Sequence, residues 1–308
     1  MYRQGTSFRA ALLMATLCTA SAVLAMQPGA AGPDTPGTGA YPAMKEEIPA
    51  LPRQVVYRPR DLTALGSLKL GVVAWGNGGC SADAASTRFH LLELASHGYL
   101  VIASGRILSG PGAPASDPEA PRAFPQTLPE DLTASIDWAL AENQRQGSPY
   151  YGRIDPRQIA VSGFSCGGLQ AALVAGDPRV ATVILQNTGT FEGERPTMPG
   201  FRVPKATLEN IRVPMLYIIG GPTDVAYENA MDDFRLINHV PVAMANLPVG
   251  HGGTYHEPDG GAAAQVAVNW LNWQLRGEAG AATWFVGENC RLCVDPRWTL
   301  DRKNLPAR

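Results

Sequence analysis

A serine between glycines is the clearest chemical signal in the chain. Ser165 lies in the segment GFSCG (163–167), after an apolar run and at the start of a helical pattern. Such a strand-to-helix turn is tight, and small residues on both sides let the two backbones pass. The hydroxyl then lies at a helix N-terminus, where amide dipoles favour developing negative charge. The pattern predicts a nucleophilic serine, and the alternative is a glycine-rich turn whose serine only caps the helix.

Five histidines could supply the base that such a serine needs, because a hydroxyl is a weak nucleophile until a base takes its proton. His251 lies in PVGHGG (248–253), between the last apolar run and the last helical pattern. Glycines on both sides suit a loop that must orient a ring. We therefore expect His251 to be the base, with His256 as the alternative.

An acid that orients the histidine is expected between the serine and the histidine in the chain. Asp224 follows the apolar run 213–219 and two glycines, and so lies at the carboxyl end of a predicted strand, where open α/β sheets place their sites. Asp232 and Asp233 fall in the next predicted helix, where we expect them to be solvated. The order Ser165, Asp224, His251 is the order of nucleophile, acid and base in α/β-hydrolases.

A serine that attacks a carbonyl also needs donors for the oxyanion, each of which contributes roughly 3–4 kcal/mol. One donor is expected to be the backbone amide of Cys166, the residue after the serine. The other is expected in the glycine-rich segment WGNGGC (75–80), which follows an early apolar run. We expect the amide of Asn77 there, with Gly78 as the second choice and a plain turn as the alternative.

Short apolar runs alternate with helical patterns along the chain, which indicates an α/β architecture with a mostly parallel sheet. The predicted strands are 69–75, 99–104, 158–163, 181–186, 213–219 and 241–247. The predicted helices are 87–97, 129–145, 167–175, 228–237 and 261–276. No repeat and no change of composition after residue 50 divides the chain, so one domain over 49–308 is expected.

The glycine loop 76–79, the elbow 163–167, Asp224 and His251 together make the chain resemble secreted α/β-hydrolase-fold esterases, broadly the dienelactone hydrolase, chlorophyllase and bacterial cutinase-like branches. The resemblance extends from about residue 50 to residue 276. It implies the α/β-hydrolase fold, a Ser-His-Asp triad, an acyl-enzyme intermediate and an oxyanion hole. The stretch 187–212 leaves room for a small lid at most.

Two positions depart from those families. The loop reads WGNGGC rather than the HGGG of many lipases and esterases, and a cysteine follows the serine where cutinase-like enzymes commonly have methionine or glutamine. Dienelactone hydrolases have a cysteine as the nucleophile itself. Ser165 holds that position here, so Cys166 is not a candidate nucleophile.

The first 25 residues have the pattern of a secretory signal peptide, with Arg3 and Arg9, an apolar run and small residues before a cleavage site at Ala25. A membrane anchor is the alternative, but the apolar segment is short for one. A flexible Gly/Pro-rich leader is expected over 26–48. The sequence therefore predicts a secreted or periplasmic protein.

Removal of residues 1–25 would take Cys18 and leave four of the five cysteines: Cys80, Cys166, Cys290 and Cys293. Four cysteines in an exported protein permit two disulfides in three connectivities. The fold that the resemblance implies places the loops after residues 75 and 163 side by side. We therefore expect one disulfide between Cys80 and Cys166, with two free buried cysteines that lie close together as the alternative, and a local disulfide in the C-x-x-C segment of the tail.

Composition limits the partners. A net charge of −2 and a pI of about 6.2 give no positive field for nucleic acid. Beyond the first 25 residues no stretch approaches the ~20 apolar residues of a membrane span, so no stable membrane insertion is expected. The tail C-x-x-C lacks further ligands for a metal, and no cofactor is implied.

The expected function is hydrolysis of carboxylic esters by a serine esterase, on a small-molecule or polymer-borne substrate. Two alternatives stay open. A peptidase or amidase on the same fold is one, although the large propeller or cap domain of many such peptidases is missing. A non-catalytic binding protein of this fold is the other, and labelling of Ser165 by a fluorophosphonate would separate it from an enzyme.

Overall fold

The computed structural model of the 308-residue chain describes residue 1 and residues 32–115, 126–193 and 203–306. Residues 2–25 of the predicted signal peptide lie outside these ranges. Within them, a single sheet has the strand order β1-β2-β4-β3-β5-β6-β7-β8-β9. Its strands are β1 (Ala43–Ile48), β2 (Leu51–Pro59), β3 (Leu70–Gly76), β4 (Tyr99–Ser104), β5 (Ile154–Phe164), β6 (Thr182–Gln186), β7 (Met215–Ile219), β8 (Val242–Asn246) and β9 (Thr299–Lys303).

The six central strands, from β4 to β8 in the sheet order, are all parallel. The edges are antiparallel, with β1 and β2 on one side and β9 on the other. Because the six central strands are parallel, their carboxyl ends all lie at the same end of the sheet. The loops that carry the predicted site residues begin there.

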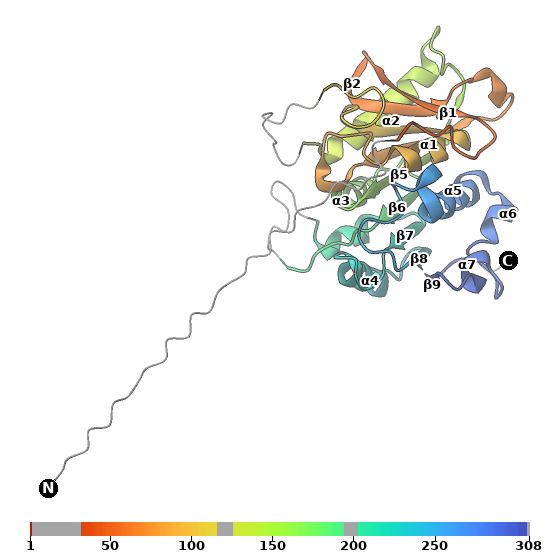
Figure 1. Cartoon of the computed structure of the whole chain (residues 1–308). Helices are drawn as coiled ribbons and strands as arrows, with labels where there is room; N and C mark the ends of the chain where they lie inside the picture. Colours follow the sequence, from red (N-terminus) through yellow and green to blue (C-terminus); the bar gives the residue numbers. More distant parts are fainter. Residues whose placement is uncertain (2–31, 116–125, 194–202, 307–308) are drawn as a thin grey trace.

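Helices cover both faces of the sheet (Figure 1). They are α1 (Arg88–Ser96), α2 (Pro129–Gln144), α3 (Cys166–Val174), α4 (Tyr227–Leu236), α5 (Gly261–Arg276), α6 (Ala279–Ala282) and α7 (Arg291–Val294). α2, α3 and α4 share one apolar core with the sheet, and α1 and α5 share the other. In the described part of the chain, no helix is long and apolar enough to cross a membrane.

The central strands are apolar on both faces because each face has its own core. Along β3, Val72 and Ala74 point into the core of α2 and α3, while Val73 and Trp75 point into that of α1 and α5. Alternate side chains of a strand face opposite sides, so a strand buried on both sides shows a continuous apolar run. That run is what the sequence showed, and the α/β architecture with a mostly parallel sheet is confirmed.

The antiparallel edges were not predicted. The leader expected over 26–48 is wrong at its end, because β1 occupies Ala43–Ile48 and pairs with β2. Its sequence, AMKEEI, has polar side chains at three of its six positions, and none of these three residues is buried. An edge strand covered on one side only does not have the apolar run of a central strand, so composition alone suggests a leader there.

A close backbone contact joins the end of β3 to the first turn of α3. A Cβ atom built on Gly167 would overlap the carbonyl group of Gly76, and one built on Gly76 would lie 2.6 Å from the carbonyl oxygen of Gly167. One built on Gly163 would also overlap Gly167. The glycines around the serine therefore let β3, β5 and α3 approach so closely that the loop after β3 lies beside Ser165.

We predict that Gly167→Ala destabilises the protein by about 3 kcal/mol or more, because the added methyl group meets backbone that cannot move aside. Gly280→Ala is the matched control, since a Cβ at Gly280 meets no atom within 4 Å. Urea unfolding monitored by circular dichroism measures both changes. Equal midpoints for the two variants would contradict the close packing.

Candidate active site

Ser165 lies in the sharp turn between β5 and α3, where its backbone adopts φ 53° and ψ −119°. Its N–H donates to the carbonyl of Gln186 at 2.8 Å, which holds the turn against the end of β6. Among the described residues, five non-glycine residues have a positive φ, and three of them, Cys80, Ser165 and Asn187, gather here. Such conformations cost free energy and concentrate at functional sites.

The structure brings Ser165, His251 and Asp224 into one hydrogen-bonded chain. Nε2 of His251 lies 3.0 Å from Oγ of Ser165, and Nδ1 lies 2.6 Å from Oδ1 of Asp224. Three loops at the carboxyl ends of β5, β7 and β8 carry these side chains, although 86 residues separate the serine from the histidine. The structure thus brings together the three side chains that the sequence analysis singled out.

The carboxylate of Asp224 is fully buried and has a donor on every side. Oδ1 accepts the Ala226 N–H at 3.0 Å besides the His251 ring, and Oδ2 accepts the Gly220 N–H at 3.0 Å and the Asn187 side chain at 2.7 Å. Burial is the largest single influence and raises the pKa of Asp224, but these hydrogen bonds together lower the pKa below its ordinary value. Asp224 is therefore an anion that can support a positive charge on His251.

His256, the alternative base, takes no part in this chain. Its ring hydrogen-bonds to neither Ser165 nor Asp224, and burial followed by the positive charge of Arg88 lowers the pKa of His256. The ring of His251, by contrast, packs on Phe164 with 5.3 Å between centroids. His251, and not His256, is therefore the histidine beside Ser165.

The loop after β3 lies against the start of α3, where the two expected oxyanion donors are found. Cys166 is the first residue of α3, so its N–H has no partner within the helix. The side chain of Asn77 donates to the carbonyls of Ser104 at 2.5 Å and Ser81 at 2.9 Å. That side chain fixes the loop, and of Asn77 only the backbone N–H could serve a substrate.

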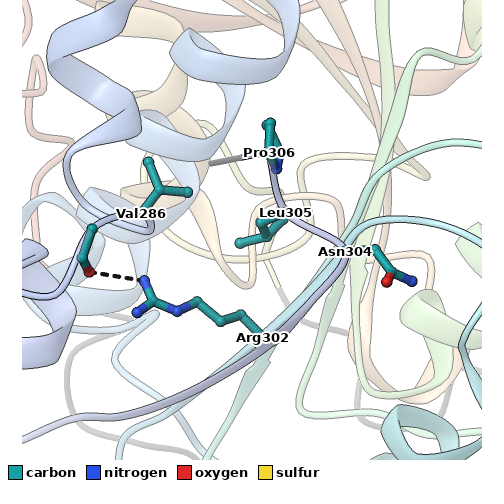
Figure 2. A pocket seen from close by; sticks show the side chains of 6 residues that line it. Val286, Arg302, Asn304, Leu305 and Pro306 are labelled. Atoms are coloured by element: carbon teal, nitrogen blue, oxygen red, sulfur yellow. Dashed lines mark hydrogen bonds between the residues drawn. The ribbon is translucent and has the colours of Figure 1, made fainter. Parts of the chain in front are cut away.

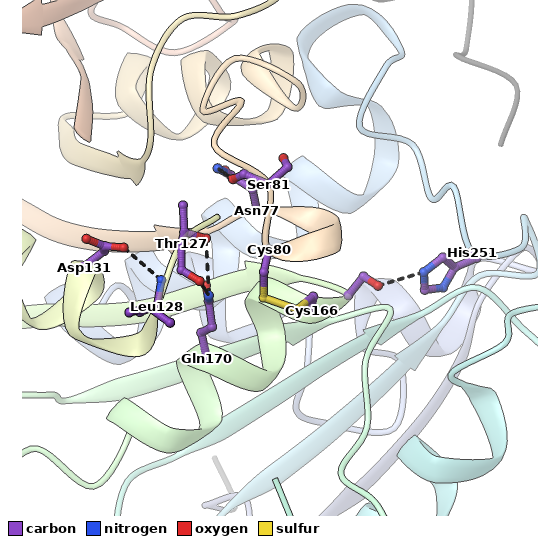
Figure 3. The surroundings of a disulfide bond; sticks show 10 residues. Asn77, Cys80, Ser81, Thr127, Leu128, Asp131, Cys166, Gln170 and His251 are labelled. Carbon is purple, nitrogen blue, oxygen red and sulfur yellow. Dashed lines mark hydrogen bonds between the residues drawn. A yellow bond between two sulfur atoms is a disulfide. The ribbon is translucent and has the colours of Figure 1, made fainter. Parts of the chain in front are cut away.

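A disulfide joins the two candidate oxyanion loops, as expected (Figure 3). Cys80 and Cys166 have their sulfur atoms 2.01 Å apart and their Cα atoms 5.2 Å apart. The carbonyl of Cys80 also accepts the N–H groups of Gln126 and Thr127. Cys290 and Cys293 form the second disulfide in the tail. The first bridge ties the residue after Ser165 to the loop of Asn77.

A pocket of about 130 Å³ opens beside Ser165 and His251. Apolar and uncharged polar residues make up its lining apart from His251. One of them is Val225, the residue after Asp224, which is 82% exposed. For comparison, a protein cavity of about 150 Å³ holds a molecule of the size of benzene. The pocket can therefore take a short chain or a single ring of a bound molecule.

Asp233 supports one wall of this pocket, contrary to the expectation that it is solvated. Its side chain is fully buried, pairs with Lys205 at 2.7 Å, and accepts both the N–H and the hydroxyl of Thr190, while the Tyr217 hydroxyl donates to it at 3.1 Å. Burial raises the pKa of Asp233, and the lysine and the hydrogen bonds only partly offset this. The ion pair thus anchors the loop after β6, whose residues Thr188, Gly189 and Phe191 line the pocket.

Two residues at the site escaped sequence reasoning, namely Asn187, which donates to Asp224, and Tyr255, which donates to Asn187. Neither lies in a motif, and their contacts depend on strands that are distant in sequence. The one available signal was the polar end of an otherwise apolar run at Gln186 and Asn187, at the carboxyl end of a predicted strand.

Another hollow, of about 200 Å³, lies beside β9 and contains no nucleophile (Figure 2). Arg302 crosses it and donates to the carbonyls of Phe285 at 2.6 Å and Gly287 at 3.1 Å. Across the described ranges, no group of three or more His, Cys, Asp or Glu side chains could hold a metal ion.

Neither a scan against protein-family models nor a search of curated proteins finds a match to this chain. The case for a function therefore depends on the geometry of the site.

We predict that the two disulfides differ in what they contribute to stability. The Cys80–Cys166 bridge spans 86 residues and the Cys290–Cys293 bridge spans 3. On the chain-entropy model, removing the first (Cys80→Ala with Cys166→Ala) costs about 4–5 kcal/mol and removing the second costs about 1–2 kcal/mol. Urea unfolding of the two double variants measures this, and peptide mapping without reductant verifies the pairing. Two alkylatable thiols at positions 80 and 166 in unreduced protein would refute it.

Proposed function

We propose that this chain is an exported serine hydrolase of carboxylic esters with the α/β-hydrolase fold. The observation that carries the proposal is the continuous hydrogen-bonded chain from Ser165 through His251 to Asp224. A serine at a positive-φ turn, a histidine within hydrogen-bond distance and a buried carboxylate behind it are the parts that nucleophilic catalysis by serine requires.

In the first half-reaction, Oγ of Ser165 attacks the ester carbonyl carbon while Nε2 of His251 takes the hydroxyl proton. The carbonyl oxygen becomes an oxyanion, which the backbone amides of Cys166 and of Asn77 or Gly78 would stabilise. The tetrahedral intermediate collapses, the bond to the alcohol oxygen breaks, and His251 gives its proton to the departing alcohol. The acyl group stays on Ser165.

In the second half-reaction, water attacks the acyl carbon while His251 takes one of its protons. The second tetrahedral intermediate expels Oγ of Ser165, which regains its proton from the histidine, and the carboxylic acid leaves. Asp224 holds the ring so that Nε2 faces the serine, and its negative charge stabilises the imidazolium that forms twice in each cycle.

The pocket supports esters over peptides as substrates. Of the residues that line it, the one with an ionisable side chain is His251, so the lining offers no charged partner for a peptide terminus. Its apolar residues, including Leu169, Phe191 and Val225, suit the hydrocarbon part of an ester. Two disulfides support export, because disulfides persist in oxidising compartments.

The proposal predicts that a fluorophosphonate probe labels Ser165 in the folded protein and that Ser165→Ala abolishes labelling. His251→Ala should lower kcat for an ester by roughly 10⁴-fold or more, because the serine loses its base. His256→Ala is the matched control and should stay within about threefold, because its ring contacts neither Ser165 nor Asp224. An unlabelled Ser165 would favour a binding protein, and the reverse ranking of the two histidines would move the base to His256.

The small pocket and its exposed surroundings predict a preference for short acyl chains without interfacial activation. A space of about 130 Å³ fills with a short chain, so a longer chain must extend into water and gains little binding energy. A series of p-nitrophenyl esters from acetate to palmitate measures kcat/KM against chain length. An optimum at long chains, with a jump in rate where the substrate forms micelles, would be inconsistent with this pocket.

A further inference from the structure

Asn187 and Tyr255 form a buried hydrogen-bonded pair behind the acid of the triad. Resting on the proposed function, we infer that both are positioning residues, which hold the carboxylate of Asp224 in the orientation that His251 requires. Neither lies within the motifs that identify the triad. Asn187 lines the pocket, but its amide donates to Asp224 and Gly250, and the Tyr255 hydroxyl donates to Asn187, so each acts through another residue.

Asn187 connects the loop of the acid to the loop of the base. Its Nδ2 donates to Oδ2 of Asp224 at 2.7 Å and to the carbonyl of Gly250 at 3.3 Å. Gly250 immediately precedes His251, so one amide group contacts both loops that must meet. The residue is 2% exposed, and its backbone N–H donates to the carbonyl of Ile218 at 2.8 Å. Asn187 is therefore fixed to β7 before its side chain reaches either loop.

The hydroxyl of Tyr255 determines which way the Asn187 amide points. It donates to Oδ1 of Asn187 at 2.5 Å. A reversed amide would put its oxygen against the Asp224 carboxylate, two acceptors facing each other, and its NH₂ group against the tyrosine. The ring of Tyr255 is fully buried and packs on Phe164, with centroids 4.6 Å apart, and on His90, at 5.4 Å. The hydroxyl is thus held by packing.

The contacts of the carboxylate show why its orientation matters. Oδ1 accepts from His251 and from the Ala226 N–H, while Oδ2 accepts from Asn187 and from the Gly220 N–H. Rotation about the bond to the carboxyl group would take Oδ1 away from Nδ1 of the histidine. Asn187 is the one side chain on Oδ2, and as a neutral donor it opposes that rotation without neutralising the charge that the imidazolium needs.

The strongest test replaces the amide by an isosteric carboxyl group, Asn187→Asp. The titratable groups around this position are Asp224 and His251 on the loops, Tyr255 on its other side, and His90 against the tyrosine ring. Two buried carboxyl groups in contact share one proton, and their last proton leaves at a raised pH. While that proton is present, the new carboxyl donates to Asp224 and accepts from Tyr255 as the amide does, and only the weaker hydrogen bond to the carbonyl of Gly250 is lost.

The expected result is a ratio of variant to wild-type kcat that falls at least about tenfold between acidic and alkaline pH, as the shared proton is lost and the two carboxylates repel. KM should change little, because Asn187 lines the pocket but its amide is bonded to Asp224, Gly250 and Tyr255 rather than directed at a substrate. A ratio that is constant across pH would overturn the inference, since a merely structural defect lowers activity equally at every pH. Thermal unfolding at each pH shows whether the variant remains folded during the measurement.

A second variant, Tyr255→Phe, keeps the ring and removes the hydroxyl that orients the amide. We expect kcat to fall about tenfold with KM within about twofold, because the amide loses its fixed direction. Tyr57→Phe is the matched control, since Tyr57 is also fully buried and its hydroxyl donates at 2.8 Å to the carbonyl of Ala84, outside the triad. Equal kcat values for the two variants would overturn the role of Tyr255.

The failure of this inference is distinguishable from failure of the proposed function. A wild-type protein that neither labels with a fluorophosphonate nor hydrolyses any ester overturns the proposed function, and the positioning roles with it. An active wild type with a pH-independent Asn187→Asp ratio overturns the positioning role alone.

Discussion

The site depends on one close backbone contact, between the end of β3 and the first turn of α3. It exists because Gly76 and Gly167 have no side chains, and because Gly163 lets β5 turn directly into the helix. The contact places the loop of Asn77 beside the helix N-terminus at Cys166. The Cys80–Cys166 disulfide then joins the same two segments covalently. Noncovalent packing and a covalent bond thus fix the separation of the two candidate oxyanion donors.

Two buried carboxylates at the site face different physical demands. Asp224 lies in the loop after β7, at the carboxyl ends of the parallel strands. Its hydrogen bonds lower the pKa of Asp224 more than burial raises it. Asp233 lies on the buried face of α4, and burial raises its pKa more than the pairing with Lys205 lowers it. In the proposed mechanism, Asp224 remains charged beside a histidine that gains and loses a proton. Asp233 has a structural role: it holds the loop after β6 through Thr190 and pairs with Lys205. Removing one partner of a buried ion pair leaves an uncompensated charge.

The sequence predicts the centre of the fold better than its edges. Strands β3 to β8 are buried on both faces, so their apolar runs stand out, and the predicted helices match α1 to α5 within about two residues. The outer strands β1 and β9 were missed because they carry many polar residues and no long apolar run. β2 is buried on both faces, but its apolar run is only Val55–Tyr57, flanked by polar residues, and it was missed because it is so short. Ser165, Asp224 and His251 were found because each follows an apolar run within a glycine-rich loop.

What the sequence could not predict is what lies behind the triad. The packing of Tyr255 on Phe164, the reach of Asn187 to Asp224 and the burial of Asp233 all arise where β5, β6, β7 and β8 come together. A residue just beyond the end of a strand contacts residues on the neighbouring strands. Which strands are neighbours depends on the strand order of the sheet, and short sequence motifs do not encode that order. The triad residues follow a chain order that a motif can describe, whereas their supports follow the sheet order. The supports of a site built on parallel strands are therefore the part that requires a structure, and here they include Asn187, whose side chain donates to both Asp224 and the carbonyl of Gly250.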